Sequence, residues 1–415
     1  MLHPTALRSR PVPIIVALAT SLAIAGCSAA VTTTAPSRPP TPSPSLGVSA
    51  TANVTAKPSA RTAFASATAA PSAKPAAAAW RLVELPDAKS VARIAVVIAR
   101  SGLVTAAGSG TPGTPATAWT SLDDGATWTA ERLPGTAGSP DRLMSWGQRT
   151  LAVGVGDGDC PHPSMVEVWV RSVAGRWTGA PADPMFCAGG TASVATSGSV
   201  AAIVGAGTGD VPYEWSSTDG LHWTDGSGVL GGLLPAGIAA DGSGLLAVGS
   251  GVAPAAAWFS DSKDGRTWDG PHPIAGTVGL SIMGDPVESN GQPAVFARDA
   301  AGSVQILRQD GEGGWRSEPC DGLHADSVSR FGAVGGSLVA LGGDRDGPAI
   351  SVSTDGAAWH PLALPAEATA SGSSATLTGV AVADGHAYLV GQVKAPTGAG
   401  AIGALWTGPA SLLAP

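Results

Sequence analysis

One short pattern returns along the chain at a regular interval: a serine, an aspartate, a glycine and, a few residues later, a tryptophan. The complete copies are Ser121, Asp123, Gly125 and Trp128; Ser217, Asp219, Gly220 and Trp223; Ser262, Asp264, Gly265 and Trp268; and Ser353, Asp355, Gly356 and Trp359. Two degraded copies end in Trp177 and Trp315. With Trp80 in front, the closing tryptophans follow one another every 44 to 49 residues. Such a period indicates a repeat architecture.

Each period contains short β-rich segments separated by Gly, Asp and Ser, and no long segment has a helical period. A hydrophobic run that closes on glycine recurs, as in 104–108, 151–154 and 246–249. About four strands in ~45 residues is the size of one propeller blade. The sequence therefore predicts an all-β fold, a seven-bladed β-propeller, with six or eight blades as the alternatives.

The repeated pattern resembles the Asp-box, or bacterial neuraminidase repeat, of sialidase-like β-propellers. The resemblance extends over most of the chain from about Trp80 onward. It implies that each box forms the turn between the third and fourth strands of a blade. In that family the box is a peripheral structural element away from the active centre, so it specifies the fold and says almost nothing about activity.

The last period supplies three strands, ending near Trp406, and lacks a closing tryptophan. The segment 80–86 matches 128–134 and 359–365, which follow complete boxes. We therefore expect the strand near Trp80 to complete the last blade. Closure of the ring removes the unpaired sheet edges that an open stack would expose.

The first residues have the pattern of an export signal, with Arg8 and Arg10 before an apolar stretch. The sequence Ile-Ala-Gly-Cys that ends at Cys27 resembles the lipobox of bacterial lipoproteins. The predicted organisation is a signal peptide at 1–26, a lipidated Cys27 with an Ala/Pro/Ser/Thr-rich tether over 27–79, and the propeller at 80–415. An ordinary secretory signal with an incidental cysteine is the alternative. Both place the mature protein outside the cytoplasm, and the first anchors it to the cell membrane on the extracytoplasmic side.

Three cysteines follow Cys27. Cys160 follows a second strand, and Cys187 lies between two blades. Both kinds of connection emerge on the same face of a propeller, and an extracytoplasmic compartment permits a disulfide between them. The alternative is two free, buried thiols. Cys320 is left over and is expected to be buried.

That face, which we call the loop face, carries many aspartates. One interpretation is a solvated rim of turn-forming residues. The other is a calcium site, with candidate ligands Asp157, Asp159, Asp344 and Asp346, although the twelve-residue calcium loop is absent. No other cofactor is expected. The net charge of −8 argues against nucleic acid as a partner.

The resemblance also invites a test for sialidase chemistry, which needs an arginine cluster, a tyrosine nucleophile with a glutamate partner, and an aspartate. Arg93 retains only part of the family's first arginine motif. Arg142 and Arg330 are the other arginines nearest the inner strands, and the two tyrosines are Tyr213, beside Glu214, and Tyr388.

The inner strands, for example 190–195, instead predict an axis lined by Ala, Ser, Val and Gly. Trp146, the one tryptophan outside the repeating series, is interpreted as core packing rather than as a stacking surface for a sugar or peptide. The sequence therefore favours a binding or assembly module without enzymatic activity, whose partner is an unidentified envelope or extracellular protein or a glycan. A sialidase-like glycoside hydrolase or carbohydrate-binding protein is the alternative.

Overall fold

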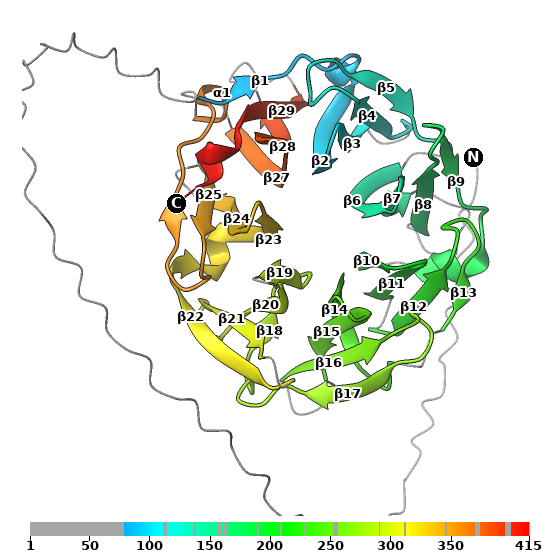
Figure 1. Ribbon diagram of the computed structural model, residues 1–415, viewed down its shortest axis with the longest axis vertical. Helices are drawn as coiled ribbons and strands as arrows, with labels where there is room; N and C mark the ends of the chain where they lie inside the picture. Colours follow the sequence, from blue (N-terminus) through cyan, green and yellow to red (C-terminus); the bar gives the residue numbers. More distant parts are fainter. Residues whose placement is uncertain are drawn as a thin grey trace, which may run out of the picture. The chain divides into compact units, whose positions relative to one another are not determined.

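The computed structural model describes residues 79–414 with short gaps. The gaps are 111–113, 136–137, 157–159, 161–164, 189–190, 208–209, 227–229, 252–255, 290, 311–312, 345–346, 370–373 and 395–399. Seven antiparallel sheets surround a common axis (Figure 1), so the predicted seven-bladed β-propeller is confirmed.

Each blade runs from an inner strand outward in chain order, except that β1 supplies the outermost strand of the last blade. The inner strands are β2 (Val91–Arg100), β6 (Gly138–Trp146), β10 (Thr191–Ser197), β14 (Leu234–Ala240), the pair β18 (Ser281–Ile282) and β19 (Val287–Ser289), β23 (Val328–Val334) and β27 (Ser374–Ala383). The second strands are β3 (Leu103–Gly110), β7 (Arg149–Gly156), β11 (Val200–Ala206), β15 (Leu245–Ser250), β20 (Gln292–Arg298), β24 (Ser337–Asp344) and β28 (His386–Lys394).

The outer half of each blade consists of a third and a fourth strand. The third strands are β4 (Thr117–Ser121), β8 (Met165–Arg171), β12 (Pro212–Ser217), β16 (Ala257–Ser262), β21 (Ser303–Gln309), β25 (Gly347–Ser353) and β29 (Ala401–Pro409). The outermost strands are β5 (Thr129–Arg132), β9 (Trp177–Gly179), β13 (Thr224–Asp225), β17 (Asp269–Pro273), β22 (Trp315–His324), β26 (His360–Pro361) and β1 (Arg81–Leu82).

In the described residues, helical structure occurs only in connections between strands and just after the last strand. It consists of η1 (Ala88–Ser90), η2 (Pro184–Ala188), η3 (Ala325–Ser327), η4 (Ala410–Leu413) and α1 (Ala366–Thr369). Within the described part of the chain, no helix has the length and apolar character needed to cross a membrane.

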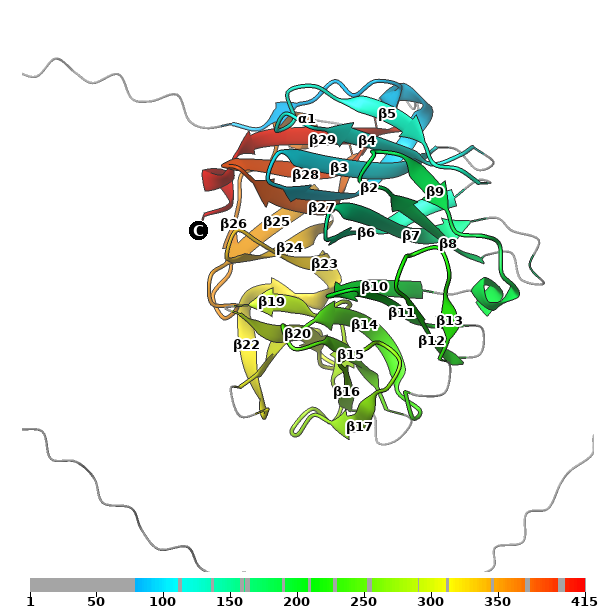
Figure 2. The same ribbon diagram turned by 45° about the vertical axis from the view of Figure 1, so that its right-hand side comes forward.

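The first described strand closes the ring, as the sequence predicts. β1 pairs with β29 of the last blade through Arg81 with Thr407 and Leu82 with Trp406. In Figure 2, β2 of the first blade lies between β27 of the last blade and β6 of the second. The N-terminal strand therefore joins the two ends of the propeller in one sheet.

A steric restriction explains why glycine recurs at the end of the hydrophobic run in the second strands. A Cβ on Gly154, Gly249, Gly342 or Gly391 would lie 2.0–2.1 Å from a carbonyl oxygen of the inner strand or, for Gly342, of the residue just before it. Beside these glycines the inner strand has a one-residue register shift, as a β-bulge produces. The recurring glycine therefore allows the inner strand to bulge close to the second strand.

The repeated Ser-Asp-Gly-Trp turns join third to fourth strands, on the face opposite the loop face. In each complete copy the serine hydroxyl accepts a hydrogen bond from the glycine N–H, at 2.7–2.9 Å. The aspartate accepts further backbone N–H groups, and the glycine has positive φ. Hydrogen bonds from the Thr267 amide and hydroxyl hold the pKa of Asp264 well below its usual range. These turns stabilise the rim and lie away from the loop face.

Candidate functional site

Three inner strands carry an arginine within the first five residues of the strand. These residues are Arg93 on β2, Arg142 on β6 and Arg330 on β23. Inner strands begin at the loop face, so the arginines lie toward the same end of the ring. Together with Asp141, Ser193 and Asp285 they form a connected group that we call the axial cluster.

Asp141 joins three blades. Its carboxylate accepts a hydrogen bond from Arg93 Nη2 at 3.2 Å, and its backbone carbonyl accepts one from Arg330 Nη2 at 3.4 Å. Arg330 Nη1 donates to the carbonyl of Thr378 in the last blade at 2.9 Å. Blades one, two, six and seven are therefore connected through two arginines and one aspartate.

Asp285 anchors the other side of the cluster. Its Oδ2 lies 2.9 Å from Arg142 Nε, and its Oδ1 accepts a hydrogen bond from Ser193 Oγ. The Ser193 hydroxyl in turn accepts the backbone N–H of Ile238 at 3.1 Å. Ser193 is 3% exposed, so its hydroxyl is fixed between the third and fourth blades.

The electrostatics of the cluster favour an additional negative charge. Three guanidinium groups face two carboxylates, which leaves one positive charge without a carboxylate. Burial, reinforced by the nearby Arg142, lowers the pKa of Arg330 to about 10, although Asp285 and Asp141 act in the opposite direction. An anionic group bound here would relieve the repulsion between the guanidinium groups.

The expectation that small residues line the axis is wrong for this end of the ring. The β-bulges beside Gly154 and Gly342 explain the difference. Arg142 and Arg330 are the first residues that pair again after the bulge in their inner strands, so they occupy equivalent positions in the second and sixth blades. Each of these two arginines lies two positions after the residue that pairs with this glycine, a placement that depends on strand pairing and that the sequence alone does not show. Asp285 had no sequence signal either, since it lies in the interrupted inner strand of the fifth blade.

The tyrosines required for sialidase chemistry have structural positions. Tyr213 lies on β12, a third strand, and its ring stacks on Trp215 with the centroids 4.3 Å apart. Tyr388 lies on β28, a second strand, and its hydroxyl donates to the carbonyl of Asp124 at 2.8 Å. Both lie outside the inner ring.

No protein-family model and no curated protein matches the sequence. Among solved structures, YCF48 bound to a D1 peptide is 17% identical, with 78% of this chain and 94% of that chain covered and a TM-score of 0.48. For the Pyrococcus horikoshii acylaminoacyl peptidase the identity is 11%, the coverage 77% and 52%, and the TM-score 0.48. For the Trypanosoma rangeli sialidase in complex with sialic acid the values are 12%, 78% and 55%, and 0.43. The chain thus spans about half the length of the peptidase and sialidase. Similarities this low establish neither a family nor an activity.

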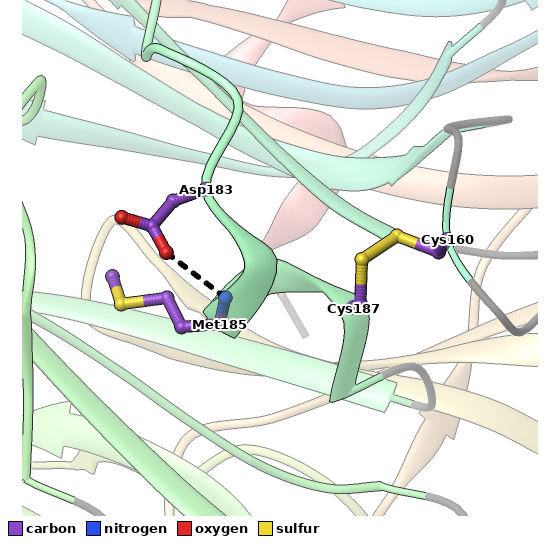
Figure 3. Close-up of a disulfide and its surroundings, with 4 residues drawn as sticks. All are labelled: Cys160, Asp183, Met185 and Cys187. Carbon is purple, nitrogen blue, oxygen red and sulfur yellow. Dashed lines mark hydrogen bonds between the residues drawn. A yellow bond between two sulfur atoms is a disulfide. The ribbon is translucent and has the colours of Figure 1, made fainter.

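The cysteines of the loop face are joined. Cys160 and Cys187 form a disulfide with their Cα atoms 5.4 Å apart, and it fastens η2 to the connection that contains Cys160 (Figure 3). Beside it, Asp183 accepts a hydrogen bond from the Met185 N–H at 3.0 Å. Cys320 is a buried free thiol whose pKa is raised to about 12 by burial. The disulfide fixes two connections on the face where the axial cluster lies.

The calcium candidates receive no support from this structure. Asp157, Asp159 and Asp346 lie outside the described residues, and Asp344 is the last residue of β24. The described ranges contain no group of three or more side chains able to hold a metal ion. Calcium binding stays a prediction, as does lipidation of Cys27, which also lies outside the described residues.

Trp146 packs in the core rather than presenting a stacking surface. It is 3% exposed, its Nε1 donates to the carbonyl of Gly198 at 3.1 Å, and the Arg149 guanidinium lies 4.0 Å from its ring centroid. With Trp146 and both tyrosines in structural positions, the axial cluster is the group of charged side chains from several blades that best fits a ligand.

Proposed function

We propose that the protein is an extracytoplasmic binding or assembly module that holds an anionic group of its partner at the axial cluster. The observation that carries this proposal is that Arg93 and Arg142 each pair with one carboxylate, whereas Arg330 beside them donates to the backbone carbonyl of Asp141 and has no carboxylate of its own among the described residues. Planar guanidinium groups are the usual recognition elements for carboxylates and phosphates, because they donate paired hydrogen bonds. The partner in this proposal is an envelope or extracellular protein or a glycan that carries such a group.

The proposal includes attachment to the cell membrane through a lipid on Cys27. The lipobox-like sequence at the end of the apolar run supports it. The Cys160–Cys187 disulfide supports an oxidising, extracytoplasmic location. In this arrangement the tether over 27–79 holds the propeller away from the bilayer.

We further propose that the repeated turns are Asp-boxes. Their shared hydrogen bonds from glycine N–H to serine, and from backbone N–H groups to aspartate, support this assignment. Their place opposite the loop face supports a structural role, which leaves ligand binding to the axial cluster.

A sialidase-like hydrolase is the second candidate, because three arginines near the axis are what such an enzyme needs for its substrate carboxylate. Two features of the chain argue for binding without hydrolysis. Asp141 and Asp285 engage two of the arginines, and Tyr213 and Tyr388 lie in a third and a second strand, outside the inner ring.

The test is a pull-down from envelope extract with the full-length chain, in parallel with a glycan array. We expect a stoichiometric partner that is lost with Arg142→Ala and retained with Arg316→Ala, an exposed arginine on the outermost strand β22. A partner retained equally by both variants would overturn the assignment of the site. Turnover of a bound glycan would overturn the assignment of a non-enzymatic role.

A further inference from the structure

Asp285 enters the axial cluster from a break in an inner strand. β18 and β19 both pair with β20: Ile282 pairs with Ala297, and Val287 pairs with Ala294. The chain advances five residues from Ile282 to Val287, whereas the paired strand advances only three. Two additional residues therefore project from the fifth blade between these strands. Gly284, with φ of 114°, precedes Asp285 in this projection.

The neighbouring blade leaves room for the projection. A Cβ at Gly237 of β14 would lie 2.5 Å from Asp285 Cα and 2.9 Å from its Oδ1. Glycine at this position therefore allows Asp285 to pass the fourth blade. Beyond it the carboxylate reaches Ser193 in the third blade and Arg142 in the second.

The contacts of Asp285 are those that a ligand carboxylate would make. One oxygen faces a guanidinium at 2.9 Å, and the other accepts a hydroxyl hydrogen bond from a buried serine. The Asp285 side chain is 31% exposed, and that of Arg142 is 20% exposed, so the pair is open to solvent on one side. An incoming anion can thus approach this pair from solvent, whereas the two donors themselves, Arg142 Nε and Ser193 Oγ, are buried and become available when Asp285 leaves.

We propose that Asp285 is a built-in occupant of the anion site, and that a ligand carboxylate binds by displacing it from Arg142 and Ser193. This inference rests on the proposed function, since it requires that the arginines bind an anion. It names the ligand group as a carboxylate that accepts from a guanidinium and a hydroxyl together. It also makes Asp285 the residue that sets the affinity threshold, because weakly held anions fail to displace it.

The experiment measures acetate binding to the full-length chain by ligand-observed NMR with ¹³C-labelled acetate. Asp285→Ala vacates the site, and we expect it to bind acetate roughly tenfold more tightly than the natural chain. Asp285→Asn removes the charge while keeping the shape. Gly237→Ala displaces the aspartate sterically while keeping its charge. Both are expected to tighten binding to a smaller extent.

Two controls make the result specific. Asp326→Ala removes an exposed aspartate elsewhere and should leave acetate affinity unchanged. Adding Arg142→Ala to Asp285→Ala should abolish the gain. If one of the variants Asp285→Ala, Asp285→Asn and Gly237→Ala fails to fold, tighter acetate binding by either of the others is sufficient to support the inference.

The outcomes separate this inference from the function on which it rests. If the natural chain binds acetate through Arg142 and none of the occupant variants binds more tightly, Asp285 organises the site and the inference is overturned alone. If no variant binds acetate in an Arg142-dependent manner, the proposed anion site is itself wrong, and the inference fails with it.

Discussion

At the scale of single residues, the most unusual group outside the axial cluster is Glu214. It lies on β12 with 0% exposure, and the Trp268 side chain faces its carboxylate as a hydrogen-bond donor, which only partly offsets the effect of burial. Burial, followed by the nearby Asp225 carboxylate, raises the pKa of Glu214 to about 8. The sequence presents it only as the neighbour of Tyr213, because whether a strand residue faces a neighbouring blade depends on packing between sheets.

We expect Glu214 to make the stability of the fold depend on pH. A raised pKa in the folded state means that the group favours folding below its ordinary pKa of 4.5, and that this contribution disappears as pH rises toward 8. Glu214→Gln should remove the dependence and be more stable than the natural chain at pH 9, by roughly 2–4 kcal/mol. Urea unfolding at pH 5, 7 and 9 measures the difference, with exposed Glu84→Gln as control. A constant difference between the Glu214 variant and the natural chain across this range would contradict the expectation.

At the scale of elements, the complete turns depend on their serine. Ser217 is 2% exposed, and its hydroxyl accepts the N–H groups of Gly220 at 2.8 Å and Asp219 at 3.2 Å. Ser217→Ala leaves these donors without their acceptor and should lower stability by about 1–3 kcal/mol. Ser172→Ala in the degraded second-blade turn is the matched control, since its hydroxyl accepts only a longer bond, 3.3 Å from the Arg176 N–H. Equal losses in thermal unfolding would show that the complete pattern has no added stabilising role.

The bulged inner strands provide a second test at this scale. Gly342 on β24 and Gly332 on β23 belong to the same blade, and neither has positive φ. A Cβ at Gly342 would lie 2.0 Å from the Ser327 carbonyl oxygen, whereas one at Gly332 has nothing within 4 Å. Gly342→Ala should therefore destabilise the fold by roughly 1–3 kcal/mol and disturb the backbone beside Arg330. Gly332→Ala should be neutral or slightly stabilising. Similar unfolding midpoints for the two variants would contradict the steric role assigned to Gly342.

These elements also show what the sequence can and cannot predict. The glycine that ends each hydrophobic run is visible in the sequence, but the bulge that it permits is a property of the paired strand. The break between β18 and β19 adds two residues that no local preference identifies. Local sequence therefore predicted the strands and turns, while the placement of Asp285 depended on pairing across the sheet.

At the scale of the whole molecule, the blade number and the closing strand follow from the repeat, because each period is one sheet. The axial cluster does not follow from it. Arg330 and Asp141 are 189 residues apart in sequence and meet only because the ring closes. Convergence of side chains from the second and sixth blades is a consequence of ring geometry, which the period does not specify. The sequence named all three arginines as the nearest to the inner strands and gave no reason to place them together.

Closure makes the short strand β1 a test of how far the ring acts as one unit. Val83, immediately after it, donates its N–H to the carbonyl of Leu405 at 2.8 Å. Val83→Pro removes this donor, whereas Val83→Ala keeps the backbone bond and serves as the control. We expect the proline variant to lose about 1–3 kcal/mol of stability. Amide hydrogen exchange should accelerate in β29 and β28, which lie next to the opened edge, and remain slow in β14 and β15 across the ring.

Exchange that is unchanged in β29 would mean that η4 and the neighbouring blades, rather than β1, hold the last blade closed. Acceleration in every blade would mean that closure stabilises the whole ring cooperatively, and the axial cluster would then lose its geometry in the same step.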